Sequence, residues 1–315
     1  MKKAVKAILT IVAVILLAVA GGSVFMLHYA LAPLHRSDGE ALQRLAHREP
    51  AFVKQWSDSL QLAGALRDTT IAMDNRGTMH AWLLEAPQAS PRTAVLVHGY
   101  KDCALSMLHI AWLYHHELGM NVVMPDLYGH GHSEGDHIDM GWHDRLDVLR
   151  WTRVAIARFG AREVVLHGIS MGAFTVMCAA GEELPPQVAC VVEDCGYTSV
   201  NDEFEHQLRA QFRLSKFPLL LATSVLCKWR YGWSFDEADA LPPLRRATVP
   251  VLFIHGGNDD FVPTPMVRRL HSTCAAPKEL WVAPGAAHAR SFTTHPAEYT
   301  RRVAVFVNRY APPHP

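Results

Sequence analysis

Residues 164–173 read Val-Val-Leu-His-Gly-Ile-Ser-Met-Gly-Ala, and the prediction of the fold starts from this stretch. A short apolar run leads into Gly-Ile-Ser-Met-Gly at 168–172, and small and apolar residues continue to Ala180. The pattern predicts a strand, a tight turn and a helix, which is the context in which Gly-x-Ser-x-Gly presents a nucleophilic serine. The flanking glycines lack a Cβ, so strand and helix can approach closely. Ser170 is therefore the candidate nucleophile, and the alternative is a turn whose serine has no catalytic role.

A serine hydroxyl needs a general base, and the base needs an orienting carboxylate. When the serine sits on such a turn, the chain order is Ser, then Asp or Glu, then His. The predicted strand Pro250–His255 is followed by Asp259 and Asp260, and the predicted strand Glu279–Val282 is followed by His288. Among the 19 histidines of the chain, His288 alone combines this order with a strand end. His288 is the candidate base, and the neighbouring aspartates are both candidates for the carboxylate.

The oxyanion of an acyl-transfer intermediate needs preorganised N–H donors. One should be the backbone N–H of Met171, the residue after the nucleophile. The second should come from the loop after the predicted strand Thr93–His98, where Gly99 permits a tight turn. We expect the backbone N–H of Tyr100 to be this second donor.

Strand-like and helix-like segments alternate along most of the chain, which predicts an α/β fold with a mostly parallel sheet and helices on both faces. The expected strands are 93–98, 121–124, 163–167, 188–192, 249–255 and 279–282, and the expected helices are 104–118, 142–159, 170–180, 264–273 and 296–310. Two earlier strands, 69–73 and 78–85, flank the turn sequence Asp74-Asn75-Arg76-Gly77. This arrangement predicts an antiparallel hairpin that makes the sheet mixed.

One segment, at about residues 197–244, interrupts the alternation and is too long for an ordinary loop. It contains two helix-like stretches, Glu203–Arg213 and Pro218–Trp229, the second of which is strongly apolar. We expect it to form a helical cap over the site, and the alternative is a surface excursion with no role in catalysis. Its apolar residues favour an acyl or aromatic substrate.

The N-terminus differs from the rest of the chain. Three lysines within the first six residues precede an uncharged run from Ala7 to Leu27. This run is long enough to cross a bilayer as a transmembrane helix, with the remaining chain outside the cytoplasm. An uncleaved anchor is favoured by the length of the run. A signal peptide cleaved near Ala18-Val19-Ala20, which would leave a secreted or periplasmic protein, is the alternative.

The expected organisation is an anchor or signal segment at 1–33, a helical linker at 34–68 and a catalytic domain with its cap insertion at 69–315. The chain of 315 residues is 50% hydrophobic and has 30 basic and 30 acidic residues, so its charge gives no case for a nucleic-acid partner. The six cysteines follow no metal-binding spacing, and we expect buried thiols. His-Glu-x-x-His and Gly-x-Gly-x-x-Gly are absent, so neither a metal nor another cofactor is expected.

Over about residues 69–312 the chain resembles the α/β-hydrolase superfamily. The motifs that carry the resemblance are His-Gly-Tyr at 98–100, Asp-Leu-Tyr-Gly-His-Gly-His-Ser at 126–133, Gly-Ile-Ser-Met-Gly at 168–172, His-Gly-Gly-Asn-Asp-Asp-Phe-Val-Pro at 255–263 and Gly-Ala-Ala-His at 285–288. The fourth is similar to the family's His-Gly-x-x-Asp-x-x-Val-Pro, which selects Asp259 over Asp260. The resemblance implies a nucleophile at Ser170 and a base at His288. With its N-terminal helix, the chain is also similar to membrane-anchored bacterial hydrolases of the Bem46-like and serine-aminopeptidase-like groups.

These features predict a serine hydrolase that cleaves ester, thioester or amide bonds of a small-molecule or acyl substrate through an acyl-enzyme. Two alternatives stay open. One is an acyltransferase that uses the same triad with an alcohol as acceptor. The other is a catalytically silent binding domain tethered to the membrane.

Overall fold

The computed structural model describes residues 2–73 and 76–313. The strands are β1 (Arg67–Met73), β2 (Gly77–Leu84), β3 (Arg92–Val97), β4 (Asn121–Pro125), β5 (Glu163–Ile169), β6 (Val188–Asp194), β7 (Val251–Gly256) and β8 (Lys278–Ala283). The helices are α1 (Lys2–Leu31), α2 (Asp38–Arg48), α3 (Ala51–Leu62), η1 (Ala104–Met107), α4 (Leu108–Ala111), η2 (Trp112–Glu117), α5 (Asp144–Phe159), α6 (Met171–Ala179), α7 (Val200–Phe212), α8 (Leu219–Tyr231), α9 (Leu241–Arg246), α10 (Pro265–Thr273), α11 (Ser291–Thr294) and α12 (Pro296–Tyr310).

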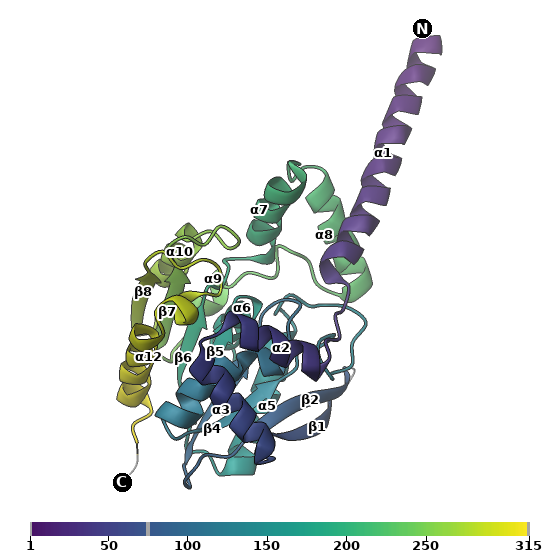
Figure 1. The fold of residues 1–315 in the computed structure, drawn as a ribbon. Helices are drawn as coiled ribbons and strands as arrows, with labels where there is room; N and C mark the ends of the chain where they lie inside the picture. The colour runs from purple at the N-terminus through teal and green to yellow at the C-terminus, as the bar shows by residue number, and fades with distance from the viewer. Residues whose placement is uncertain (1, 74–75, 314–315) are drawn as a thin grey trace. The chain divides into compact units, whose positions relative to one another are not determined.

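The strands form one eight-stranded sheet in the order β1-β2-β4-β3-β5-β6-β7-β8 (Figure 1). β2 pairs antiparallel with both β1 and β4, and every later pair is parallel. The predicted mixed sheet, mostly parallel with an antiparallel hairpin at its start, is confirmed. Asp74 and Asn75 of the predicted hairpin turn lie outside the described residues.

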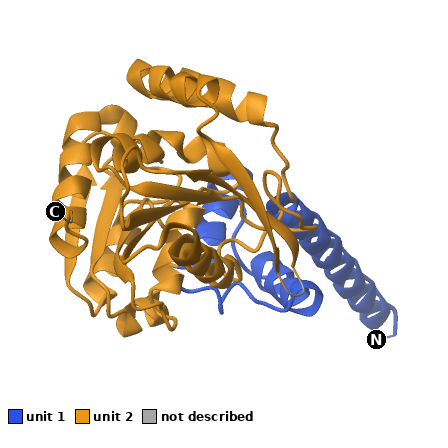
Figure 2. Cartoon of the chain, turned by 90° about the horizontal axis from the view of Figure 1, so that it is seen from below, with its two compact units in different colours: residues 1–32, 199–239 blue, residues 33–198, 240–315 orange. Residues whose placement is uncertain are grey.

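The middle of the sheet is covered on both sides. Every residue of β3 is buried, and successive side chains of a strand point to opposite faces. Ala94 and Leu96 belong to a hydrophobic cluster that includes Tyr299 and Phe306 of α12. The helices α5 and α6 contact β3 as well, and Figure 2 shows helices on both sides of the sheet. This two-sided burial explains why the β3 sequence is almost continuously apolar.

The segment expected as a linker, 34–68, contributes two helices to the core. A capping box begins α2: the N–H of Glu40 donates to Ser37 Oγ at 3.4 Å, and the N–H of Ser37 donates to Glu40 Oε2 at 3.2 Å. Leu45 of α2 and Val53 of α3 are buried in the same cluster as the sheet. These helices therefore pack as part of the sheet-containing unit.

The chain divides into two compact units, which Figure 2 shows in different colours. Residues 33–198 and 240–315 form the unit that contains the sheet, and residues 1–32 and 199–239 form the other. The predicted cap insertion, 197–244, is thus longer than the segment that leaves the sheet unit, because α9 belongs with the sheet.

In the smaller unit, the C-terminal half of α1 packs against the insertion helices α7 and α8. A Cβ added to Gly22 would lie 3.1 Å from Leu219 Cδ1 of α8. The hydroxyl of Tyr29 donates to Gln211 Oε1 at 2.9 Å, and its ring meets that of Phe212 edge-on at 5.6 Å. The N-terminal segment and the insertion were predicted as separate parts of the chain. In the structure they pack together in one compact unit.

The N-terminal half of α1 is apolar and exposed. Its exposed large side chains between the first turn and the middle are Val5, Ile8, Leu9, Ile11, Val12, Val14, Ile15, Leu16 and Leu17. Among residues 2–73 and 76–313, α1 is the one helix whose length and composition suit a membrane span. A membrane anchor and a signal sequence both fit this finding.

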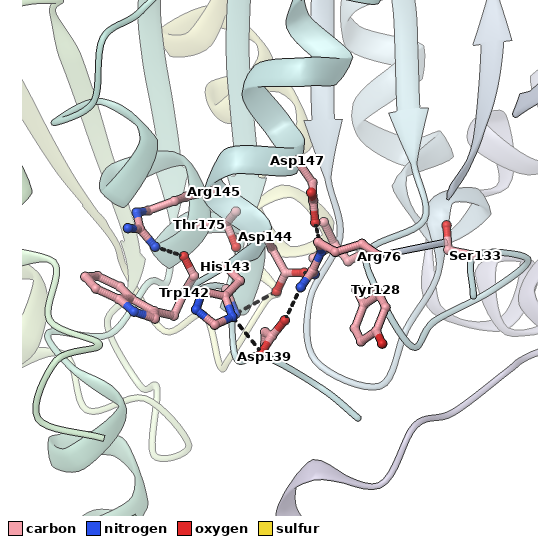
Figure 3. A network of polar contacts seen from close by, with 12 residues as sticks. Arg76, Tyr128, Ser133, Asp139, Trp142, His143, Asp144, Arg145, Asp147 and Thr175 are labelled. Carbon is pink, nitrogen blue, oxygen red and sulfur yellow. Dashed lines mark hydrogen bonds and ion pairs between the residues drawn. The ribbon is translucent and has the colours of Figure 1, made fainter. Parts of the chain in front are cut away.

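A buried ion-pair cluster ties the β1–β2 hairpin to the start of α5 (Figure 3). The guanidinium of Arg76 lies 2.5 Å from Asp139, 3.1 Å from Asp144 and 2.6 Å from Asp147. The three carboxylates are almost fully buried, which raises the pKa of Asp144 to about 7 and that of Asp147 to about 6. Arg76 supplies the positive charge that such burial requires.

The predicted helix 104–118 is wrong in one respect, because it is not a single α-helix. It consists of the 3₁₀ turn η1, the short helix α4 and the π-helix η2. The N–H of Leu118 bonds to the carbonyl of Leu113 at 3.1 Å, five residues back, so the last turns are wider than an α-helix. Hydrophobic periodicity does not distinguish these helix types. Two short helices, α9 and α11, were not predicted.

Candidate active site

The sharp turn between β5 and α6 presents Ser170. Its backbone angles are φ 56° and ψ −116°, a conformation that residues other than glycine rarely adopt. A Cβ on Gly168 would lie 2.1 Å from the carbonyl oxygen of Gly172, and one on Gly172 would lie 2.0 Å from that of Val97. Both glycines are required because backbone occupies the space that a side chain would need.

The three side chains selected from the sequence lie in hydrogen-bond contact. Ser170 Oγ is 2.9 Å from His288 Nε2, and His288 Nδ1 is 2.8 Å from Asp259 Oδ2. A proton on Nδ1 is donated to the carboxylate, which leaves Nε2 to accept from the serine hydroxyl. Ser170, Asp259 and His288 follow the parallel strands β5, β7 and β8, whose carboxyl ends share one edge of the sheet.

The two neighbouring aspartates have different environments. Asp259 is buried, and its Oδ1 accepts the backbone N–H groups of Phe261 at 3.0 Å and Val262 at 2.9 Å. Those bonds fix the carboxylate so that Oδ2 faces His288. Asp260 is exposed. The structure therefore places Asp259, and not its neighbour, against the imidazole.

The loop after β3 passes directly beside Ser170. A Cβ on Gly99 would lie 3.4 Å from the carbonyl oxygen of Ile169 and 3.5 Å from Ser170 Cβ. Tyr100 follows in this loop, and Met171 begins α6, in whose first turn the backbone N–H groups lack partners within the helix. The residues of both predicted oxyanion donors thus lie next to Ser170.

Two buried histidines hold this loop. His98 Nε2 accepts the N–H of Leu127 at 3.0 Å, and His130 Nε2 accepts the N–H of Lys101 at 3.3 Å. Burial lowers the pKa of His98, and it lowers that of His130 to about 3, so both rings are neutral and can accept. His130 belongs to the Asp126–Ser133 motif, which therefore supports the backbone next to Tyr100.

Sequence reasoning missed Asp194, which ends β6 at the same sheet edge. Its carbonyl oxygen accepts the N–H of Ser170 at 2.8 Å, and its Oδ1 accepts the hydroxyl of Ser291 at 3.3 Å. Burial raises the pKa of its carboxyl to about 6. The available signal was the acidic pair Glu193-Asp194, which directly follows the predicted strand 188–192.

One group of side chains has the spacing of a metal site. Ligand atoms of Cys195, Asp259 and His288 all lie within 4.8 Å of one another. Burial raises the pKa of the Cys195 thiol well above its ordinary value, so it does not supply the thiolate that a metal prefers. Asp259 and His288 already bond to each other. The chemistry of this set therefore does not favour a metal ion.

A pocket opens beside Ser170, and α2 forms one wall of it. The residues that line it are Ala41, Arg44, Leu45, Arg48, Glu49, Gly99, Tyr100, Lys101, Asp102, Ser106, Met107, His109, Ile169, Ser170, Phe261, His288 and Ala289. The ring of Phe261 lies 4.8 Å from that of His288. The wall from α2 was not predicted, because sequence reasoning treated that helix as part of a linker.

The fold and the turn at Ser170 are those of the α/β hydrolases, and residues 94–302 match the Alpha/beta hydrolase family. The chain belongs to this family. The resemblance of its motifs to the superfamily is confirmed, and the narrower resemblance to membrane-anchored bacterial groups stays a prediction.

Particular relatives include a Bacillus subtilis protein, "Uncharacterized protein YqkD", which is 30% identical over 224 residues, 71% of this chain and 73% of the relative. Among solved structures, the Pyrococcus furiosus esterase Pf2001 has a TM-score of 0.65 at 21% identity and covers 78% of this chain and 91% of its own. The Pyrococcus horikoshii acylaminoacyl peptidase has a TM-score of 0.60 at 15% identity, over 79% of this chain and 42% of its own. At these identities the two structures show a shared fold.

Proposed function

We propose that this protein is a serine hydrolase that cleaves ester, thioester or amide bonds through an acyl-enzyme. The observation that carries the proposal is the continuous hydrogen-bonded series from Ser170 Oγ through His288 to Asp259. Membership of a hydrolase family supports it further. Esterases and a peptidase among the structures of the same fold agree with this reaction class.

In the proposed mechanism, His288 Nε2 takes the hydroxyl proton as Ser170 Oγ attacks the acyl carbon. The resulting oxyanion is stabilised by the backbone N–H groups of Met171 and Tyr100. The imidazolium then gives its proton to the leaving alcohol, thiol or amine, and the acyl group stays on the serine. Water repeats the sequence, with His288 as base, and releases the acid. Asp259 holds the imidazole in the required tautomer and stabilises its positive charge.

Covalent labelling with a fluorophosphonate, located by peptide mass spectrometry, tests the proposal. The label should appear on Ser170 and vanish in Ser170→Ala. Ser106→Ala is a matched control, because Ser106 lines the same pocket but donates its hydroxyl to the carbonyl of Cys103 at 2.6 Å. A folded protein that takes no label would instead favour a silent binding domain. Products that form only with an added alcohol would identify an acyltransferase.

We also propose that α1 remains attached as a membrane anchor, with the catalytic unit outside the cytoplasm. The exposed apolar side chains between Ile8 and Leu17 and the three lysines that precede them support this topology. An intact N-terminal mass and retention in the membrane after carbonate washing are the expected results. A soluble mature chain that begins near Gly21 would show a cleaved signal peptide instead.

A further inference from the structure

The charges of the pocket beside Ser170 are unevenly compensated. Three cationic residues line it, Arg44, Arg48 and Lys101, together with two acidic residues, Glu49 and Asp102. Both acidic residues have partners that do not line the pocket. The charges of the lining that remain available to a ligand are therefore those of the cations.

Asp102 Oδ1 forms an ion pair with Arg36 at 3.3 Å. Glu49 Oε2 accepts the hydroxyl of Thr293 at 2.7 Å, and its Oε1 lies 3.8 Å from Arg290. Neither Arg36 nor Arg290 lines the pocket. The two carboxylates thus have partners outside the pocket lining. Within the lining, the three cationic residues outnumber the two acidic ones, so the pocket has an excess of positive charge.

Arg48 is a partly buried cation whose guanidinium is incompletely hydrogen-bonded. Its side chain is half-buried, its Nε is shielded from solvent without a hydrogen-bond partner, and no ion pair to its guanidinium is formed within the described residues. Burial and the nearby Arg290 lower the pKa of the guanidinium, although Asp102 and Glu49 act in the opposite direction. A partly desolvated cation is stabilised by an anion at hydrogen-bond distance.

Arg44 lies one helical turn before Arg48 and lines the same pocket. The exposed side chain of Arg44 and the half-buried side chain of Arg48 therefore reach the pocket from the same face of α2. Guanidinium groups bind carboxylate and phosphate oxygens in a bidentate manner. The wall from α2 has the chemistry of an anion site that shares a pocket with the nucleophile.

We propose that the substrate carries a carboxylate or phosphate group that Arg48, assisted by Arg44, binds while Ser170 attacks the acyl carbon. This inference rests on the proposed hydrolase function and adds to it a class of substrate: an anionic acyl compound. Arg48 acts as the specificity residue, and neutral esters of the same size react without its help.

Two pairs of esters test the proposal with the full-length protein in detergent. Mono-p-nitrophenyl glutarate is compared with p-nitrophenyl pentanoate, which has the same acyl length without the charge. The 4-carboxyphenyl ester of butyric acid is compared with its neutral 4-carbamoylphenyl analogue, so that an anion on either side of the scissile bond is probed. The wild type should prefer the anionic member of at least one pair in kcat/KM.

Arg48→Met should lower kcat/KM for that anionic ester by about 10- to 100-fold, the effect of losing one charged hydrogen-bond partner, and change the neutral ester less than about twofold. Arg48→Lys should restore part of the preference. Arg268→Gln, which removes an exposed arginine of α10 outside the pocket, is the matched control and should change neither ester. All rates are compared at one ionic strength.

Glutarate and phenyl phosphate, as competitive inhibitors, distinguish the two kinds of anion. Inhibition by either that weakens in Arg48→Met supports the proposal, and the stronger inhibitor identifies the preferred group. Equal rates within both ester pairs, unchanged by Arg48→Met, would overturn the proposal while leaving the hydrolase function intact. Failure to hydrolyse any of the four esters, with no fluorophosphonate label on Ser170, would overturn the hydrolase function itself.

Discussion

Replacement of Asp259 by asparagine separates the roles that the structure gives to its two oxygen atoms. Oδ1 accepts two backbone N–H groups, and Oδ2 accepts from His288 Nδ1. In Asp259→Asn the amide oxygen should keep the two backbone bonds, which turns the NH₂ group toward Nδ1. The imidazole must then accept at Nδ1 and carry its proton on Nε2, where it can no longer accept from Ser170.

The expected loss of kcat in Asp259→Asn can be worked out from these contacts. Turning the amide to restore the productive tautomer sacrifices two backbone hydrogen bonds, at about 1 kcal/mol each. Loss of the carboxylate charge beside the imidazolium costs about another 2 kcal/mol, the strength of a charged hydrogen bond. Together, about 4 kcal/mol corresponds to a fall in kcat of about 10³-fold. The melting temperature should change little, because the buried amide keeps its backbone bonds.

Hydrolysis of p-nitrophenyl butyrate and thermal unfolding provide the two measurements. Asp260→Asn is the control, since its exposed side chain should leave kcat within about twofold. The reasoning is refuted if Asp259→Asn retains near-normal turnover, or if Asp260→Asn loses as much activity as Asp259→Asn.

Three further substitutions test other parts of the structure. Gly172→Ala should prevent stable folding or lower the melting temperature strongly, because the added Cβ would lie 2.0 Å from the carbonyl oxygen of Val97. Gly39→Ala is the control: the added Cβ has no atom within 4 Å, so this change should be neutral or stabilising by about 0.5–1 kcal/mol. His130 has a folded pKa of about 3, below the ordinary value of 6.5, so the unfolded chain binds more protons between these values and stability falls as pH drops through that window. Urea unfolding of His130→Gln should show a pH slope that is shallower by up to about 1.4 kcal/mol per pH unit, and an unchanged slope would contradict the assignment. Arg76→Met should lower the free energy of unfolding by about 3–5 kcal/mol at pH 8, because three buried carboxylates lose their cation. The loss should be smaller at pH 5, where the carboxyl groups with raised pKa values take up protons. A loss that does not depend on pH would argue against this explanation.

The parts of the site that could be predicted depend on short stretches of chain. Gly168 and Gly172 mark a turn that only glycine fits, and this constraint is local enough to be read from five residues. The order of Ser170, Asp259 and His288 along the chain then placed each candidate after a strand. The carboxyl ends of parallel strands lie at one edge of the sheet. Local sequence patterns were therefore sufficient to predict that these distant residues lie close together.

The parts that could not be predicted depend on tertiary packing. The spacing of Arg44 and Arg48 gives a polar face of α2, but it does not reveal that this face lines the pocket of a serine more than a hundred residues later. Asp194 was missed for a related reason, since its importance lies in a backbone bond to Ser170 from a neighbouring strand. Helix periodicity identifies the polar face of a helix, but the residues that this face contacts are known only from the folded structure.

The two halves of the N-terminal helix α1 have different surroundings. Its exposed apolar stretch, Ile8–Leu17, precedes the half that contacts α7 and α8 through Gly22 and Tyr29. Truncation at residue 21 would remove the first part and leave those contacts intact. Truncation at residue 33 would also remove the packing partner of the insertion and uncover its apolar side chains. A shortened protein made for biochemical work should therefore begin near Gly21, because a start at residue 33 would also remove the part of α1 that packs against the insertion.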